Sequence, residues 1–395
     1  MNLNYLLKKG WRKFWQTALY GIWKSVRIFH VRRKLPENIQ HILLLPIGGI
    51  GNFIMFTPLI TALRARYPNA HFTVIIRSRG ASQVIQGYPD CDVIEFNFNN
   101  LAALFRFARR TPLPRFDLAF NCETFYGACL AKLSGARFLV SFTYSFGITS
   151  QSDFLCYRAC HVDHQKHEVD QYFDLYRLIQ PTESVVVRDQ FFHLDSSHTA
   201  FARDFFKRNG LKPPIIGMHI GSLSQVPEKR WPLERFAELA MRLFNDYNAS
   251  IIVDGGSGEI ELASQFQKLI GANGVCLNIV NLYSLKQSAA IIQRCSLFIS
   301  NDSGPMHMAA AVGTPTIGIF GPTNPAKNRP WGDPAKMKVV RVELPCSPCY
   351  KPFSSYVTCT NPNYLECMKN ISVDMVFTQA KILLEAFSQN SPTDE

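Results

Sequence analysis

The residues with the clearest chemical potential lie in segment 298–325, FISNDSGPMHMAAAVGTPTIGIFGPTNP. An apolar strand is expected here to run directly into a helix, and the polar residues at the junction are Asp302, Ser303, Gly304 and His307. The first turn of a helix offers free backbone N–H groups and a positive dipole end, which together bind anions. Taken singly, Asp302 or Ser303 could only cap the helix and His307 could be an ordinary helix residue. Together with the turn FGPTNP, however, the cluster predicts a diphosphate site.

Two further turns also follow expected strands. Segment 219–232, HIGSLSQVPEKRWP, supplies hydroxyls and cations suited to phosphate oxygens, namely Ser222, Ser224, Lys229 and Arg230, although a solvated loop could look the same. The turn GGIGN at 48–52 lacks the glycine spacing of a dinucleotide fingerprint. By itself it predicts only a tight turn that lets a helix pack closely on a sheet.

The elements that must position these turns alternate between apolar strands and helical segments. In the first half the strand candidates are 41–46, 71–77, 92–96 and 117–122, and 166–180 has helical spacing. In the second half the strand candidates are 214–221, 249–256, 274–279, 296–300 and 315–320, with helices expected at 233–247, 259–270, 284–294 and 305–312. This rhythm predicts an α/β fold of two Rossmann-like parallel sheets with helices on both faces.

The same pattern divides the chain into five segments. We expect a basic N-terminal segment at 1–36, a first Rossmann-like domain at 37–185, a connection at 186–213, a second Rossmann-like domain at 214–345, and a cysteine-rich loop with a C-terminal helix at 346–395.

Three blocks of this sequence resemble glycosyltransferase family 9, which contains the ADP-heptose:lipopolysaccharide heptosyltransferases. The blocks are ILLLPIGGIGNFIMFTPLITALRARYPNAHFTVI, GMHIGS…KRWPLERFAELA and ISNDSGPMHMAAAVGTPTIGIFGPTNP, and the likeness spans roughly residues 40 to 385. The resemblance implies the GT-B fold, in which two Rossmann-like domains face a central cleft. It also implies an inverting, metal-independent transfer of a sugar from a nucleotide diphosphate to a hydroxyl of a lipid-linked acceptor.

The resemblance further implies roles for individual residues. The donor would be bound in the C-terminal half by Ser222, Lys229, Asp302, Ser303, Gly304 and His307, with Glu259 near the ribose and Tyr283 beside the base. The acceptor would lie on the N-terminal half, near Gly49 and Gly51. Helix-terminal N–H groups and Lys229 would stabilise the departing diphosphate without a metal ion or other cofactor.

The catalytic base is where this sequence departs from the family. The turn that commonly carries Gly-Asp in heptosyltransferases reads Gly51-Asn52 here, and a carboxamide cannot accept the proton of the acceptor hydroxyl. Asn52 could instead cap the following helix or hold a substrate hydroxyl. The alternative carboxylate is Glu123, which follows the strand candidate at 117–122, although Glu123 could equally be an ordinary surface residue.

Charge and composition point to a globular protein with one unusual end. Apolar residues make up 47% and charged residues 18%, which excludes a wholly disordered chain. Of the net charge of +12, nine positive charges lie within residues 1–36, which contain no acid, so the rest of the chain carries 12 − 9 = +3. The segment 1–34 also holds three tryptophans, but it has no apolar run long enough to span a bilayer, and the lack of a clean apolar core with a small-residue cleavage site argues against a secretory signal. It predicts a basic amphipathic helix on an anionic membrane surface. Packing of its apolar face on the protein is the alternative, and nucleic acid is not the expected partner.

The chain has eleven cysteines, and four of them are clustered as Cys346, Cys349, Cys359 and Cys367. Their spacing is compatible with zinc, but the second pair lacks the short spacing of a zinc ribbon, so a reduced structural loop is the preferred interpretation. His161, His164 and His167 are expected in a solvated loop, with His167 near the acceptor.

These observations predict a glycosyltransferase at the cytoplasmic face of the membrane, acting with a nucleotide-sugar donor on a lipopolysaccharide core or related glycolipid. Two alternatives stay open. The same fold could use a UDP- or GDP-sugar, since the diphosphate cluster does not recognise the base. Asn52 also leaves room for a noncatalytic nucleotide-sugar-binding protein.

Overall fold

The structure is a computed structural model of the chain that describes residues 34–46, 48–77, 80–97, 100–122, 125–143, 155–181, 189–222, 225–271, 276–350 and 359–387. The basic helix expected over 1–34 therefore lies outside the described residues, apart from Lys34. Within these ranges no helix combines the length and the apolar character that crossing a bilayer requires.

The N-terminal domain is built on a six-stranded parallel sheet with the order β3-β2-β1-β4-β5-β6. Its strands are β1 (His41–Leu45), β2 (His71–Ile76), β3 (Cys91–Glu95), β4 (Leu118–Asn121), β5 (Phe138–Thr143) and β6 (Arg158–His161). In register, Ile42 of β1 lies between Phe72 of β2 and Leu118 of β4. The helices are α2 (Ile50–Arg66), the short η2 (Ala81–Val84), α3 (Leu101–Arg110), α4 (Phe125–Leu133) and α5 (Glu168–Arg177).

The two faces of this sheet are covered by different helix pairs because alternate strand residues point to opposite sides. Ile42 and Leu44 of β1 pack with α2 and α5 in one apolar cluster. Leu43 and Leu45 pack with Leu104 of α3 and with α4 in another. The buried strands are nearly all apolar, as expected for a parallel sheet covered on both faces.

The C-terminal domain repeats the plan with a second six-stranded parallel sheet, in the order β12-β11-β10-β7-β8-β9. Its strands are β7 (Ile215–His219), β8 (Ser250–Val253), β9 (Cys276–Asn278), β10 (Leu297–Asn301), β11 (Thr316–Phe320) and β12 (Met337–Arg341). Its helices are α6 (Ser196–Arg208), η5 (Pro227–Lys229), α7 (Leu233–Tyr247), η6 (Ser257–Glu259), α8 (Ile260–Ile270), α9 (Leu285–Gln293), α10 (Gly304–Ala311), α11 (Pro325–Asn328), α12 (Glu366–Lys369) and α13 (Val373–Phe387).

The expected α/β architecture of two parallel sheets is confirmed, but the strand list was incomplete. Strands β5, β6 and β12 were not predicted. Ser141 and Thr143 interrupt the apolar run of β5, and β6 and β12 are edge strands with partly exposed side chains. Helix α6 falls in the expected connection, yet it packs against α9 and so belongs structurally to the C-terminal domain.

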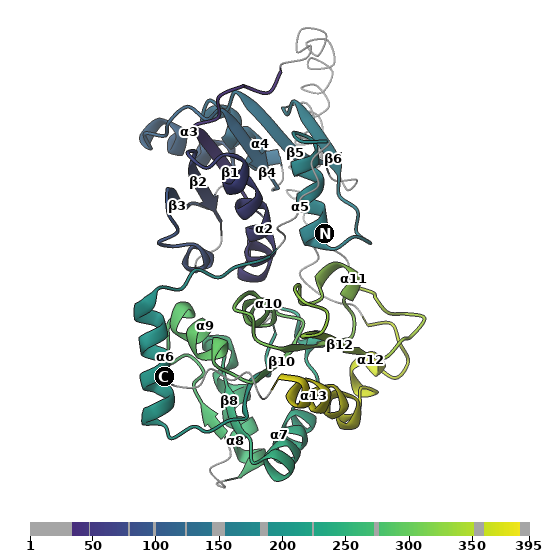
Figure 1. Cartoon of the computed structure of the whole chain (residues 1–395). Helices are drawn as coiled ribbons and strands as arrows, with labels where there is room; N and C mark the ends of the chain where they lie inside the picture. The colour runs from purple at the N-terminus through teal and green to yellow at the C-terminus, as the bar shows by residue number, and fades with distance from the viewer. Residues whose placement is uncertain are drawn as a thin grey trace.

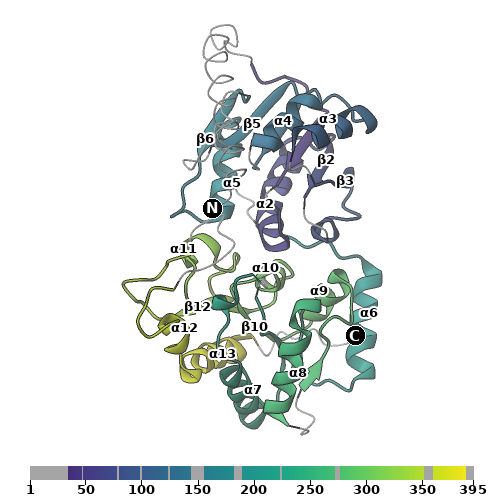
Figure 2. The ribbon, with the colours of Figure 1, turned by 180° about the vertical axis from the view of Figure 1, so that it is seen from behind.

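The two domains lie one above the other and touch along a seam between α2 and α10 (Figures 1 and 2). Helix α2 follows β1 and α10 follows β10, so the carboxyl ends of these two central strands face each other. Phe298, Met308 and Ala309 of the C-terminal domain share one apolar cluster with α2 and α5. The seam is therefore a packed apolar interface. It also brings together strand ends of the kind at which open α/β sheets bind ligands.

Candidate functional site

The centre of the site is an ion pair at the end of β10. Lys229 Nζ lies 2.9 Å from Asp302 Oδ2, and the two side chains are only 16% and 5% exposed. Lys229 is the last residue of η5, far from Asp302 in sequence. The structure therefore brings together two residues that the sequence placed in separate phosphate-binding turns, and the cation faces the start of α10.

The N-terminus of α10 has no side-chain cap. Ser303 is the N-cap residue but its side chain does not cap the helix, and its Oγ instead lies 3.0 Å from Ser300 Oγ. Gly304 begins the helix, so no side chain covers this end at that position. First-turn N–H groups with no capping side chain can be satisfied by an anionic ligand. The geometry suits a phosphate group, whose binding here stays a prediction.

Asn301 holds the loops of the site in place, and the sequence analysis missed it. Its side chain is fully buried, and its Oδ1 accepts from the Trp231 backbone N–H at 2.9 Å. Its Nδ2 donates to the carbonyls of Ile220 and Gly221 at 3.1 and 2.8 Å. One side chain therefore ties the loop after β7 and the segment after Lys229 to the end of β10. The sequence does show an amide at the end of an apolar strand, and such an amide must find hydrogen-bond partners when it is buried.

Ser222 occupies a structural position in its loop. Its Oγ donates to the Val226 carbonyl at 2.9 Å and accepts from Arg230 Nε at 3.2 Å. Arg230 thereby joins Lys229 as a second cation beside the loop. The predicted contact between Ser222 and phosphate stays untested, and Ser224 lies outside the described residues.

Glu259 and Tyr283, the two looser donor-site predictions, have different surroundings. Glu259 is buried, and its Oε2 accepts from the Gly256 backbone N–H at 2.9 Å. A Cβ added to Gly221 would lie 2.3 Å from Glu259 Cγ, so the carboxylate sits directly against the loop that carries Ser222. Tyr283 instead packs its ring on Phe201 and Phe205 of α6, in a separate apolar cluster.

His307 joins the donor-side cluster to the N-terminal domain. It is buried in the first turn of α10, and a Cβ added to Gly51 of α2 would lie 2.8 Å from its Cδ2 atom. The pKa of His307 is lowered to about 4, chiefly by burial, against the opposing charge of Asp302 and with a smaller contribution from the charge of Lys229. The imidazole is therefore neutral at pH 7, and its Nδ1 makes no hydrogen bond within the described structure. A neutral imidazole whose Nδ1 has no partner can form one hydrogen bond with a ligand at the seam, as donor or as acceptor.

We expect Gly51→Ala to lower turnover about tenfold or more, because the new methyl group must push His307 and α10 away from α2. A misplacement of about 1 Å in a catalytic site can cost up to ~10²-fold in rate. The free energy of unfolding should fall by up to about 2 kcal/mol, because overpacking a core costs ~1 to 3 kcal/mol and the better helix propensity of alanine offsets about 1 kcal/mol of it. Steady-state kinetics and urea unfolding measure the two effects. Unchanged turnover would mean that the close approach of the two helices is not needed.

His167 lies at the same seam, from the opposite side. Its Nδ1 accepts from the Val169 N–H as the N-cap of α5, and its Nε2 lies 3.0 Å from the Arg329 carbonyl of the C-terminal domain. Its ring also packs on Trp331, with ring centroids 4.5 Å apart. The expectation that His167 belongs to a solvated loop is wrong: the side chain is buried, because α11 and the segment after it cover the start of α5. Its proposed closeness to the acceptor stays a prediction.

The other two histidines lie nearby in the N-terminal domain. His161 ends β6 and is exposed, with its Nδ1 2.9 Å from Thr143 Oγ1. His164 is half-buried, and its backbone carbonyl accepts from Asn324 Nδ2 of the C-terminal domain at 3.5 Å.

Stability should fall as the pH falls below about 6.5, because the two seam histidines stay neutral when folded. Burial lowers the pKa of His167 to about 3, against an ordinary value near 6.5. Between these values the unfolded chain binds protons that the folded chain does not, so the free energy of unfolding decreases with falling pH, by up to about 1.4 kcal/mol per pH unit for each histidine. Above pH 6.5 the effect is absent.

Urea unfolding at pH 7, 6 and 5 measures this slope. His307→Gln removes one of the two groups and should make the decline shallower. An identical slope in the variant would contradict the assignment of His307 as a buried neutral group.

Asn52 lies in the first turn of α2, beside this seam. Its Nδ2 donates to the Gly48 carbonyl at 3.1 Å, while the N-cap position is taken by Gly49 at φ 103°. A left-handed φ of this kind favours glycine. The suggestion that Asn52 caps the helix is therefore wrong, and a substrate hydroxyl remains its possible partner. Glu123, the predicted base, lies outside the described residues.

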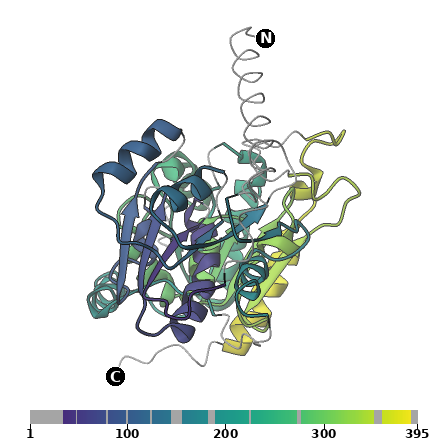
Figure 3. The same cartoon turned by 90° about the horizontal axis from the view of Figure 1, so that it is seen from above.

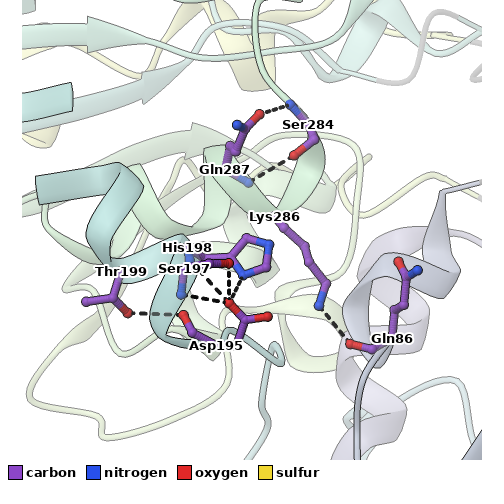
Figure 4. A network of polar contacts seen from close by, with 8 residues as sticks. All are labelled: Gln86, Asp195, Ser197, His198, Thr199, Ser284, Lys286 and Gln287. Carbon is purple, nitrogen blue, oxygen red and sulfur yellow. Dashed lines mark hydrogen bonds and ion pairs between the residues drawn. The ribbon is translucent and has the colours of Figure 1, made fainter. Parts of the chain in front are cut away.

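Polar contacts fix the domains on both sides of the seam. On one side Lys327 of α11 pairs with Glu168 of α5 at 2.7 Å, with both side chains largely buried. On the other side Lys286 of α9 donates to the Gln86 carbonyl at 2.7 Å (Figure 4). Asp195, the N-cap of α6, lies near Lys286 in the same view and opposes the lowering of the Lys286 pKa by burial.

The four clustered cysteines are free thiols that line one small cavity of about 20 Å³. Asn361 Nδ2 donates to Cys346 Sγ at 3.5 Å, and the Leu365 N–H donates to Cys359 Sγ at 3.2 Å. In the part of the chain that the structure describes, no group of three or more His, Cys, Asp or Glu residues is arranged to hold a metal ion. Bound zinc by elemental analysis, lost in a Cys346→Ser variant, would overturn the interpretation as a reduced structural loop.

Comparison with known proteins agrees with the resemblance seen in the sequence. Residues 104–358 match the family described as glycosyltransferase family 9 (heptosyltransferase). A lipooligosaccharide heptosyltransferase 2 of Campylobacter jejuni serotype O:2 is 33% identical over 47% of this chain, an alignment that spans 55% of the relative's own length. The protein of the same name from C. jejuni serotype O:6 is 25% identical over 85% of this chain and 96% of the relative.

The fold agrees as well. The structure of E. coli ADP-heptose lps heptosyltransferase II superposes with a TM-score of 0.67 at 20% identity, over 88% of this chain and 99% of that one. With two facing parallel sheets and a family match over more than half of its length, the chain belongs to glycosyltransferase family 9 and is a glycosyltransferase of the GT-B fold.

Proposed function

We propose that this glycosyltransferase transfers a heptose from ADP-heptose to the core of lipopolysaccharide, with inversion at the anomeric carbon. The names of the relatives support both substrates: the two Campylobacter proteins are lipooligosaccharide heptosyltransferases, and the E. coli protein of the same fold is named for ADP-heptose. The observation that carries the proposal is the buried Lys229–Asp302 pair at the open N-terminus of α10.

This arrangement suits the departure of a nucleoside diphosphate. Transfer breaks the bond between the anomeric carbon and the β-phosphate oxygen, so negative charge grows on the diphosphate. Lys229, Arg230 and the first-turn N–H groups of α10 are fixed before the reaction, and preorganised donors of this kind stabilise developing charge. They would supply the positive charge for which other enzymes use a divalent cation, so the proposed reaction needs none.

The attacking hydroxyl comes from the acceptor on the face of the sugar opposite the diphosphate, and its proton must go to a base. We keep Glu123 as that base, because the side chain at position 52 is an amide. Asn52 lies one helical residue from Gly51, which contacts His307, and so could orient the acceptor hydroxyl. If Glu123→Gln leaves turnover intact while Asn52→Asp does not raise it, this assignment is wrong.

The acceptor is a lipid-linked sugar, so we place the enzyme at the cytoplasmic face of the membrane, held by the basic segment 1–34. Deleting residues 1–34 should move the protein from the membrane fraction to the soluble fraction. Unchanged fractionation would remove this segment as the anchor.

The decisive test offers ADP-heptose and matched UDP- and GDP-sugars with defined core-oligosaccharide acceptors. We expect ADP release and an acceptor mass increase of one heptose with ADP-heptose, unchanged by EDTA. Proton NMR of the product should show the anomeric configuration opposite to that of the donor. Turnover with another nucleotide sugar alone would correct the donor, and donor binding without release of nucleoside diphosphate would identify a noncatalytic protein.

A further inference from the structure

On the outer surface of the N-terminal domain, exposed apolar and basic side chains lie together in a region that has no role in the proposed reaction. Among the described residues of this domain, three large apolar side chains are markedly exposed, and each lies on α3 or α4: Leu101 at 45%, Phe105 at 59% and Leu133 at 37%. Helices α3 and α4 pack against each other and cover the same face of the sheet. We call their outward side the α3–α4 surface.

Contacts on its inner side hold α3 in one orientation, so the exposure of Leu101 and Phe105 follows from the fold. Leu104 is fully buried in the core beneath it, and the ring of Phe107 stacks on Phe96 with centroids 4.0 Å apart. Asn100 caps the helix, its Oδ1 accepting from the Ala103 N–H at 2.8 Å. Leu101 and Phe105 are four residues apart and so lie next to each other on the outward side.

The same surface is strongly basic. Arg106, Arg109 and Arg110 of α3 are exposed, and neither α3 nor α4 contains an acidic residue. Over residues 97–141 the sequence has six basic residues against two acidic ones. Guanidinium groups suit phosphate oxygens, and apolar side chains beside them can enter the headgroup region.

The surface is also well placed for an extended partner. Helix α3 lies at the end of the N-terminal domain remote from the C-terminal domain in both side views, and it projects at the rim when seen from above (Figures 1, 2 and 3). A flat surface could approach it without touching the seam between the domains.

We propose that the α3–α4 surface docks on an anionic lipid bilayer, with Leu101 and Phe105 among the headgroups and the arginines on lipid phosphates. A second copy of the chain is a poorer occupant, because a symmetric contact would bring the same arginines together. This contact is separate from the one proposed for residues 1–34 and does not depend on which sugar is transferred. It would fix the acceptor domain against the layer that carries lipid-linked substrates.

The experiment measures co-sedimentation of the full chain with vesicles of phosphatidylcholine alone or with about 30% phosphatidylglycerol. Leu101→Ser/Phe105→Ser and Arg106→Gln/Arg109→Gln/Arg110→Gln should each weaken partitioning onto the phosphatidylglycerol vesicles at least tenfold, since a basic residue near an anionic surface contributes about fivefold. High salt should abolish the preference for phosphatidylglycerol.

Matched controls come from the C-terminal domain. Leu269→Ser/Ile382→Ser removes apolar groups of similar exposure, 48% and 46%, and Lys207→Gln/Arg208→Gln/Lys212→Gln removes three exposed cations. Both controls should partition like the unaltered protein.

Hydrogen–deuterium exchange of the full chain provides a second readout that binding by residues 1–34 cannot mask. Phosphatidylglycerol vesicles should slow exchange in peptides covering α3. Unslowed exchange in α3, or α3 variants that bind vesicles like the unaltered protein, would overturn the proposal. Conversion of a dimer to a monomer by the α3 substitutions, with vesicle binding unchanged, would identify a contact between protein copies instead.

Discussion

Lys229→Met is expected to lower kcat/KM by about 10²- to 10³-fold, the range seen when one preorganised donor to a developing charge is removed. Lys229 lies beside the start of α10, where it pairs with Asp302 at 2.9 Å. Methionine keeps an unbranched side chain of nearly the same length but cannot neutralise a departing phosphate. Steady-state kinetics with the nucleotide sugar that the enzyme accepts measures the effect.

The same variant should also lose stability, on the order of 3 kcal/mol, because it leaves the buried carboxylate of Asp302 unpaired. The double variant Lys229→Met/Asp302→Asn removes both charges, so we expect it to regain most of the stability and none of the activity. Lys268→Met, an exposed substitution on α8, is the matched control and should change neither. Recovery of activity in the double variant would show that Lys229 serves only to neutralise Asp302.

Asn301→Ala is expected to lower the free energy of unfolding by about 3 to 5 kcal/mol. The variant leaves one buried backbone N–H and two buried carbonyls without their partners, and a buried polar group without a hydrogen bond costs about 1 to 3 kcal/mol. Donor affinity should fall as well, since the loop of Ser222 and the segment after Lys229 are no longer tied to β10. Urea unfolding and calorimetric titration with ADP give the two quantities.

Ser300→Ala is the neighbouring comparison. Ser300 is equally buried, but its Oγ contacts only the Asn301 carbonyl and Ser303 Oγ among the described contacts, so a loss of about 1 kcal/mol is expected. If Asn301→Ala costs no more than Ser300→Ala, the three hydrogen bonds do not hold the site together.

The sequence could predict the parts of the fold that depend on local pattern. Apolar runs such as 41–46 and 315–320 can only be buried strands in an alternating α/β chain, and α7 has the predicted bounds of 233–247. The short edge strand β6, with the sequence RACH, carries no such pattern because it depends on pairing with β5 and packing from α5.

The residues of the site also divide into those with a local sequence pattern and those that depend on contacts distant in sequence. The turn after β10 could be identified because a strand that runs into Asp302 and a proline-started helix has a local signature. The ion pair between Asp302 and Lys229 joins residues 73 positions apart, and burial of His167 depends on Trp331 and Arg329 from the other domain. The ion pair depends on how the loops of the C-terminal domain fold over its sheet, and the burial of His167 depends on how the two domains pack. The spacing of residues along one strand or helix encodes neither. For Asn301 the sequence indicates only that an amide at a strand end needs partners when buried; the partners themselves are backbone groups of distant loops, which the sequence does not identify.

The shared apolar cluster between the sheets has a consequence for how the enzyme melts. Phe298 and Met308 pack among side chains of α2 and α5, so neither half can denature alone without exposing part of the other's interior to water. The two Rossmann-like units should therefore lose structure together, in one cooperative heat-absorption peak, although each has the size of an autonomous folding unit.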